Sequence, residues 1–154
     1  MHKTSLDDAY IDFLKHLPEG GDIVLLILKG HLLIENQIYL LIKNRLPKPD
    51  TLKPARLTSY QKICLAQALV SETQSSVDSW LWKAVIKLNE LRNSIVHNLS
   101  VSDVEAGMSS LVKLASKANN SNDIRGDFEL TLLTIYFEIH NRIEKLDESD
   151  YDLE

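Results

Sequence analysis

Residues 23–42 read IVLLILKGHLLIENQIYLLI, an apolar run that predicts the central helix of the fold. Six residues that are polar or lack a side chain interrupt the run, which argues against a membrane span. A helix that is apolar on almost every side must pack against several other elements. We therefore predict a buried helix of a bundle, capped by Asp22 and ending near Arg45. The six interrupting residues are Lys29, Gly30, His31, Glu35, Asn36 and Gln37. The expected solvent-facing stripe consists of Lys29, Asn36 and Lys43, which recur every seven residues.

The rest of the sequence also reads as helices separated by turns. The segment PEGG at residues 18–21 and three prolines within residues 47–54 mark the first two breaks. Ser102, with Glu105 three positions later, has the pattern of a capping box. Strand-like alternation and internal repeats are absent from the sequence, so we predict an all-α, up-and-down helical bundle of about five to six helices. The other expected helices run from Ser5 to His16, Ser59 to Ser71, Ser75 or Ser76 to about Leu99, Ser102 to about Lys117, and Asp123 to about Leu146.

The composition is that of one soluble globular domain. The chain has 154 residues, of which 44% are hydrophobic and 25% charged, which is enough to bury a core without disulfides. We assign residues 1–146 to a single helical domain and residues 147–154 to an acidic tail. The lone cysteine, Cys64, lies in an apolar helical run, where we expect buried filler. It cannot form an intrachain disulfide, and residues 1–10 carry acids where a signal peptide is basic and then apolar. We therefore expect a cytoplasmic protein without a membrane span.

The charge is unevenly distributed along the chain. A net charge of −5 argues against binding of long nucleic acid through a broad basic surface. Bases nevertheless predominate between residues 43 and 62, where Asp50 is the only acid. This basic segment is expected either to hold an RNA backbone or to be a solvated loop. Its candidate substrate-binding residues are Lys43, Arg45, Lys48, Lys53 and Arg56.

Residues 90–98 read ELRNSIVHN and carry the most reactive set of side chains in the chain. Arg92 can hold a phosphate or stabilise negative charge that develops on it, and His97 can take or give a proton near pH 7. A cation and an imidazole together suit the cleavage of a phosphodiester. The alternative interpretation is structural: an arginine and a histidine at a helix end that pair with neighbouring acids and carbonyls.

The run resembles the signature of the HEPN superfamily, which consists of an Arg, a polar residue that is often Asn, a few mostly apolar residues and a His. Here Arg92 and Asn93 are followed by Ser94-Ile95-Val96 and then by His97. The resemblance implies a HEPN-like domain, a homodimer and a metal-independent endoribonuclease of a toxin-antitoxin or phage-defence system. It also implies an RNA substrate and a cognate antitoxin or regulatory protein as partners. Other members of the superfamily are non-catalytic partners.

Helical geometry constrains how this motif could work. Arg92 and His97 are about 140° apart around an ideal helix and about 7.5 Å apart along it, so they do not converge on one atom. Glu90, Asn93 and His97 share a polar face, whereas Arg92 lies at the edge of the apolar stripe. Either the helix end distorts or a second chain completes the site across a two-fold axis. HEPN nucleases build composite dimer sites, so the resemblance also favours a homodimer.

We expect the three motif residues to be catalytic. His97 is the predicted general base for a ribose 2′-hydroxyl, and Arg92 is predicted to bind the phosphate. Asn93 is predicted to orient the imidazole or to bind the phosphate. Glu90 and Glu35 are supporting candidates for pairing with Arg92. The competing interpretation of Glu35 is a local pair with His31, four residues earlier in the same helix.

Other function classes have weaker support. The histidines have no metal-ligand spacing around them and there is no glycine-rich phosphate loop, so we expect neither a metal nor a cofactor. Trp80 and Trp82 are expected to pack in the core or at a dimer interface, with base stacking as the alternative. A non-catalytic dimeric helical interaction or regulatory module that retains the motif is the main competing function. A DNA-binding repressor ranks third because the chain has no basic recognition helix.

Overall fold

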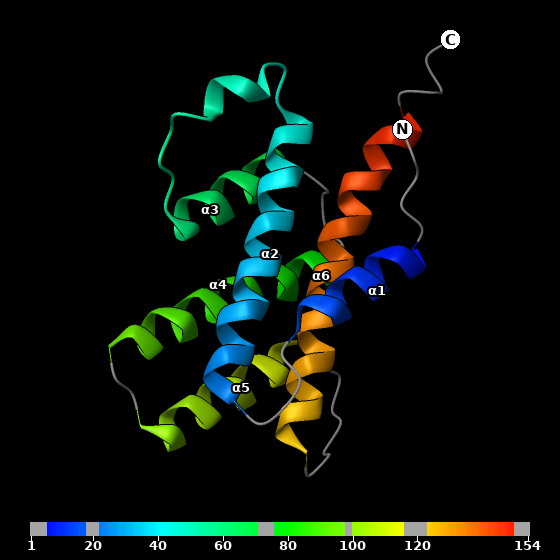
Figure 1. The fold of residues 1–154 in the computed structure, drawn as a ribbon. Coiled ribbons are helices and arrows are strands. Elements are labelled where there is room, and N and C mark those ends of the chain that lie inside the picture. The colour runs from blue at the N-terminus through cyan, green and yellow to red at the C-terminus, as the bar shows by residue number, and fades with distance from the viewer. Residues whose placement is uncertain (1–5, 18–21, 71–75, 98–99, 116–122, 150–154) are drawn as a thin grey trace.

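The computed structural model describes residues 6–17, 22–70, 76–97, 100–115 and 123–149 (Figure 1). These residues form six α-helices and one 3₁₀ helix, and no strand occurs among them. The predicted all-α helical bundle is therefore confirmed. The elements are α1 (Leu6–His16), α2 (Ile23–Arg45), η1 (Pro49–Leu52), α3 (Ser59–Leu69), α4 (Ser76–Val96), α5 (Val101–Ala115) and α6 (Ile124–Ser149).

Helix α2 is the central element, as the sequence predicts. The side chain of Asp22 accepts a hydrogen bond from the amide of Leu25 at 3.1 Å, which caps the helix at its expected start. The helix ends at Arg45, two residues before Pro47. It packs against α1, α3, α4 and α6, and Figure 1 shows α4 crossing near its middle. This arrangement explains why α2 is apolar on several sides.

The two longest helices, α2 and α6, lie side by side and run in the same direction. Along this pair Gln37 donates a hydrogen bond to the hydroxyl of Tyr136, and Asn44 donates one to the carbonyl of Ile143. Near the start of the pair the helices approach closely. A Cβ added to Gly30 would lie 2.6 Å from a methyl group of Leu132, so glycine allows the two backbones to come together there. The sequence pattern did not indicate this parallel pairing.

One hydrophobic core joins all six α-helices. The largest side chains that are fully buried include Phe13 of α1 and Phe128 of α6. The ring of Phe13 lies 4.9 Å from that of Tyr136, which fixes α1 against α6. Trp82 is buried and Trp80 packs partly buried against the same core, which agrees with core packing of both indoles.

The exposed face of α2 differs from the prediction. Instead of a narrow polar stripe, this face also carries large apolar side chains that are 37–50% exposed. The expectation that nearly all apolar residues of α2 are buried was wrong, because the neighbouring helices cover only part of its circumference. The exposed apolar residues are Val24, Leu25, Leu28, Leu32 and Leu40.

By length and composition α2 could cross a membrane, and within the described residues it is the one helix that could. Its mean hydropathy is 1.4 and 33% of its apolar window is buried inside the protein. The core helix of a soluble protein can have the same length and composition. The property is therefore weak support for a membrane span, and the contacts of α2 with four other helices favour a core role.

Several local predictions require correction. Cys64 is exposed, so it does not serve as buried filler. Helix α5 begins at Val101, and its cap is Ser100, whose hydroxyl accepts a hydrogen bond from the amide of Asp103 at 3.3 Å. The capping box expected at Ser102 was therefore placed two residues too late. Helix α6 continues to Ser149, beyond the expected end. The expected helix ends at residues 71, 98–99 and 116–117 fall outside the described residues.

Candidate functional site

Helix α4 carries the motif at its C-terminal end. The hydroxyl of Ser94 donates a hydrogen bond to the carbonyl of Glu90 at 2.8 Å, and the helix ends at Val96. The amide of His97 then bonds to the carbonyl three residues earlier, that of Ser94, at 3.1 Å. This spacing is that of a 3₁₀ turn, in which each residue turns by about 120° instead of about 100°. The helix therefore tightens at the residue that carries the imidazole.

Arg92 and Asn93 are held together by a direct contact. The Nη1 group of Arg92 donates a hydrogen bond to Oδ1 of Asn93 at 3.0 Å. Arg92 is half-buried, whereas Asn93 and His97 are exposed. The structure therefore joins the first two predicted catalytic residues through a side-chain hydrogen bond, and the contact described for the third, His97, is made by its backbone amide.

Glu90 was predicted to pair with Arg92, but the contact described for its carboxylate is with Lys87. It is exposed, and its carboxylate lies 3.8 Å from the ammonium of Lys87, one turn earlier. A pair between exposed side chains at this distance contributes little to stability. The contact places the Glu90 carboxylate beside Lys87 and not beside Arg92.

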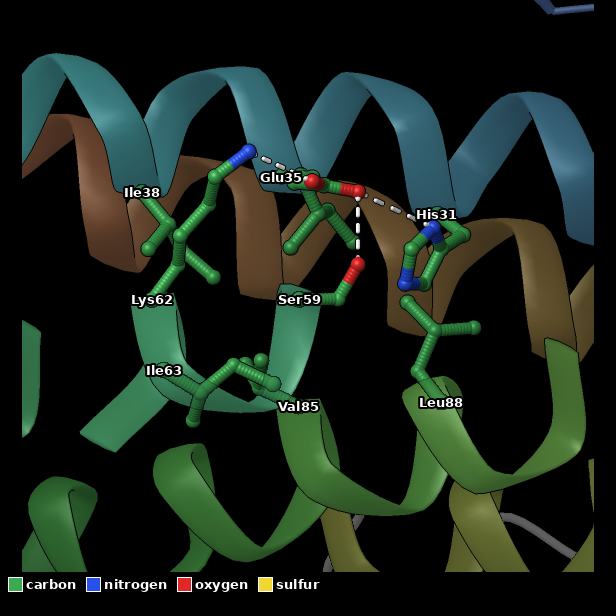
Figure 2. Close-up of a pocket in the computed structure, with 9 residues that line it drawn as sticks. His31, Glu35, Ile38, Ser59, Lys62, Ile63, Val85 and Leu88 are labelled. Atoms are coloured by element: carbon green, nitrogen blue, oxygen red, sulfur yellow. Dashed lines mark hydrogen bonds and ion pairs between the residues drawn. The ribbon is translucent and has the colours of Figure 1, made fainter. Parts of the chain in front are cut away.

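A group of buried and half-buried polar side chains lies between α2, α3 and α4. We call it the His31 cluster and define it as His31, Glu35, Ser59, Lys62 and Asn89. Figure 2 shows the carboxylate of Glu35 between the side chains of Lys62, Ser59 and His31. It accepts hydrogen bonds from Lys62 at 2.8 Å and from Ser59 at 3.0 Å. The cluster ties the start of α3 to the middle of α2.

His31 links this network to α4. Its Nδ1 lies 3.6 Å from Glu35, which confirms the local pair predicted from the i, i+4 spacing. Its Nε2 lies 3.2 Å from Oδ1 of Asn89 in a hydrogen bond. His31 and Asn89 are only 7% and 6% exposed. Since Asn89 precedes Arg92 by one helical turn, the cluster approaches the motif from inside the protein.

The environment shifts the pKa values of two members of the cluster. Burial lowers the pKa of His31 below 6.5. The carboxylate of Glu35 and the hydrogen bond to Asn89 act in the opposite direction and raise it. The positive charges of Arg92 and Lys62 lower it further. Burial alone would raise the pKa of Glu35, but the hydrogen bonds from Lys62 and Ser59 outweigh it and hold the pKa below 4.5. At pH 7 the cluster therefore contains a neutral imidazole and an ionised carboxylate.

A small cavity opens beside the cluster, as Figure 2 shows. Its volume is about 10 Å³, which is the space needed for about one water molecule. Four cluster members and five apolar side chains line it, and neither Arg92 nor His97 is among them. This cavity is too small for a nucleotide, and the motif does not line it. The apolar lining residues are Ile34, Ile38, Ile63, Val85 and Leu88.

The predicted substrate-binding residues lie away from the motif within one chain. Lys43 is twelve residues from His31 along α2, which corresponds to about 18 Å, and its ammonium lies 5.0 Å from the ring centre of Tyr39. Arg45 donates a hydrogen bond to the carbonyl of Arg142 at 2.9 Å. The other three lie in the loop that connects α2 to α3, and all three are exposed. They are Lys48, Lys53 and Arg56, of which Lys53 lies 3.5 Å from Asp50.

Within the described part of the chain, no three His, Cys, Asp or Glu side chains are grouped so that they could hold a metal ion. The prediction that the protein takes neither a metal nor a cofactor stays a prediction.

Comparison with known proteins does not assign a family. No protein-family model matches the chain, and neither the curated proteins nor the solved structures contain a match. The resemblance to HEPN proteins therefore rests on residues 92–97 together with the helical fold.

Sequence analysis missed part of the His31 cluster. It identified His31 and Glu35 from their spacing, but it treated Lys62 only as part of the basic segment and did not single out Ser59. Asn89 had a usable signal, because it follows Val85 by four residues and Leu88 directly on a helix whose core face is apolar. A polar amide beside that face indicates a buried hydrogen bond.

Proposed function

We propose that this protein is an endoribonuclease of the toxin-antitoxin or phage-defence type that cleaves RNA without a metal ion. The observation that carries the proposal is the arrangement at the end of α4. Arg92 and Asn93 are joined by a hydrogen bond, His97 is exposed directly beyond the helix, and none of the three is buried in the core. A cation, an amide and an imidazole at an accessible helix end are the groups that phosphodiester cleavage needs.

The proposed reaction uses the substrate's own hydroxyl as nucleophile. His97 removes the proton of a ribose 2′-hydroxyl, and the 2′-oxygen forms a bond to the adjacent phosphorus. The bond from phosphorus to the 5′-oxygen breaks, and that oxygen takes a proton from water or from a second imidazole. The products are a 2′,3′-cyclic phosphate and a 5′-hydroxyl end. Arg92 stabilises the charge that develops on the phosphate oxygens, and Asn93 holds the guanidinium through its carbonyl oxygen.

The proposal includes a homodimer, because the side chains of Arg92 and His97 diverge within one chain. A two-fold axis beside the ends of two α4 helices would bring an arginine of one copy near a histidine of the other. Apolar side chains suited to such an interface are exposed on α2 and on α4. Val96, which is 64% exposed, lies between the motif residues, and Leu28 and Leu32 flank His31 in sequence. Clustered exposed apolar residues mark interaction surfaces more often than isolated ones.

The same proposal places the protein in the cytoplasm and assigns the basic segment to the RNA backbone. The exposed side chains of Lys48, Lys53 and Arg56 are free of the core and can follow a phosphate chain. Lys43 and Arg45 are half-buried at the end of α2 and would contact RNA only at their tips. A cognate antitoxin or regulatory protein is a further proposed partner.

The competing candidate is a non-catalytic dimeric interaction module that retains the motif. One observation favours it: the cavity beside α4 lies at the His31 cluster and not at the motif. In this case Arg92 and His97 contribute to a partner interface through charge and hydrogen bonds. The first candidate predicts RNA cleavage at the motif, and the second predicts binding of a partner there without cleavage.

Cleavage of a mixed tRNA and mRNA pool in EDTA tests the proposal. The purified protein is compared with Arg92→Ala and His97→Ala, and the ends of the products are analysed. We expect cyclic-phosphate ends from the wild type and at least a 100-fold loss in both variants. Equal trace activity in all three proteins would contradict the nuclease and favour the interaction module.

A further inference from the structure

The contact between His31 and Asn89 is a buried polar connection between α2 and α4. Both side chains are more than nine-tenths buried, and the hydrogen bond between them is 3.2 Å long. A buried amide or imidazole that loses its hydrogen-bond partner is costly, so the contact favours one position of α4 relative to α2. Asn89 and Arg92 are three residues apart and therefore project from neighbouring positions on α4. The position of the Arg92 side chain therefore depends on where the turn of α4 that carries Asn89 lies.

We propose that His31 is a positioning residue for Arg92, because its hydrogen bond to Asn89 holds the turn of α4 that carries the guanidinium. The catalytic consequence rests on the proposed function, whereas the contact between the two side chains does not. His31 is too buried to touch RNA, so its effect on cleavage must pass through Arg92.

The charges around His31 explain why its protonation state matters. Three charged groups act on it electrostatically: Glu35 of α2, Lys62 of α3 and Arg92 of α4. A neutral imidazole adds no charge next to the Arg92 guanidinium. Protonation would attract the ring toward Glu35, since Nδ1 already lies 3.6 Å from that carboxylate, and would repel Arg92 and Lys62. Acid is therefore expected to displace the guanidinium from its half-buried position.

The effect of Arg92 on His31 can be tested without an assay of RNA cleavage. In the full-length protein, the pKa of each histidine is measured by NMR from ¹⁵N-labelled imidazoles. Arg92→Gln should raise the pKa of His31 by a few tenths of a unit, because a neighbouring cation is removed, and Arg92→Lys should leave it near the wild-type value. His16, which is exposed at the end of α1, serves as the internal control. An unchanged pKa of His31 in Arg92→Gln would overturn the proposal.

The reciprocal measurement covers the case in which Arg92→Gln does not fold. The side-chain Nε–Hε signal of Arg92 is compared between the wild type and His31→Gln. We expect the signal to move, and to move in the wild type as acid protonates His31. A signal that is identical in both proteins and insensitive to pH would also overturn the proposal.

The effect on catalysis needs a control that lowers stability without touching α4. Gln37→Leu serves this purpose, because Gln37 lies on the same helix and bonds across to Tyr136 of α6. We expect His31→Gln to lower kcat by about 10- to 100-fold with little change in KM, and to remove the part of the acid limb of the pH profile that comes from protonation of His31, while the part that comes from the general base His97 remains. Gln37→Leu should leave both unchanged. If both variants lose the same factor in kcat and keep the wild-type pH profile, His31 has only a structural role, and the proposal is overturned. A wild type that does not cleave RNA refutes the proposed function, and the NMR titration then decides the contact by itself.

Discussion

Glu35 shows how one carboxylate can join two helices. It lies in the middle of an apolar helix, where an unpaired charge would be costly. Lys62 and Ser59 of α3 donate hydrogen bonds to it, and His31 lies on its other side. The ammonium of Lys62 also lies 5.4 Å from the ring centre of Tyr39, which adds a cation–π contact. The carboxylate therefore supports the α2–α3 contact more directly than it supports the motif.

Glu35→Gln should destabilise the protein, because the ammonium of Lys62 loses its ionic partner while remaining largely buried. Glu35 and Lys62 are both 22% exposed at the side chain, so we expect a loss of about 1–3 kcal/mol in the free energy of unfolding. Urea denaturation measures it. In the Glu35→Gln/Lys62→Met double variant the loss should be smaller than the sum of the single losses. Additive losses would show that the two groups do not interact.

Stability should decrease as the pH falls below about 6.5. The pKa of His31 is lowered in the folded protein, so the unfolded chain binds the proton more tightly and acid favours unfolding. The pKa of Glu35 is also lowered, which adds a second loss below its ordinary value of 4.5. Denaturation curves at a series of pH values should show both. His31→Gln should remove the decrease in stability below pH 6.5 and keep the decrease below pH 4.5. If the dependence of stability on pH is the same in this variant as in the wild type, the first decrease does not come from His31.

At the residue scale the sequence was informative where helix geometry alone brings side chains together. The His31–Glu35 pair follows from a four-residue spacing, and the separation of Arg92 from His97 follows from a five-residue one. Lys62 and Asn89 come from other helices, and their positions depend on how those helices pack. A single sequence does not contain that information in any local pattern.

At the element scale the helix starts depend on individual caps. Thr58 and Gln61 form a reciprocal capping box at α3, with bonds of 3.2 and 3.0 Å between side chains and backbone amides. At α5 the hydroxyl of Ser100 accepts from the amide of Asp103 and donates to its carboxylate at 2.6 Å. Both arrangements satisfy amides that have no partner within the helix.

Ser100→Ala should therefore destabilise the protein by about 0.5–2 kcal/mol, the usual cost of losing such a cap. Ser102→Ala removes a hydroxyl from the same turn and is the matched control, with an expected change within about 0.5 kcal/mol. Thermal or urea unfolding distinguishes the two variants. A larger loss in Ser102→Ala than in Ser100→Ala would support the capping box expected from the sequence instead.

The elements themselves were largely predictable, and their ends were less so. The bounds of α2 follow from Asp22 and Pro47, which are strong start and stop signals. For α5 two serines stand close together, and the pattern with Glu105 favoured the wrong one. The exposed leucines of α2 could not be predicted either, because apolar periodicity does not reveal which faces have a neighbour.

At the scale of the whole molecule the proposed site requires two copies of the chain. If Arg92 of one copy acts with His97 of the other, a heterodimer of Arg92→Ala and His97→Ala contains one complete site. Mixing the two inactive variants should then restore about a quarter of the wild-type cleavage rate, since half of the dimers are mixed and each has one of two sites. RNA cleavage after denaturation and refolding of the mixture measures this. Two copies of the same variant, treated in the same way, are the control, and a mixture that stays inactive would place Arg92 and His97 of each site in one chain.

The parallel pairing of α2 with α6 has a consequence for how the chain folds. Their hydrogen bonds join residues 99 positions apart in sequence, so the principal neighbour of α2 is synthesised long after α2 itself. Closing so large a loop is entropically costly and makes the pairing a late event. During synthesis the apolar side of α2 that α6 covers has no native partner until the C-terminal helix leaves the ribosome. The nascent chain is therefore expected to expose this apolar side of α2 until α6 has been synthesised, and to reach its final topology only after that.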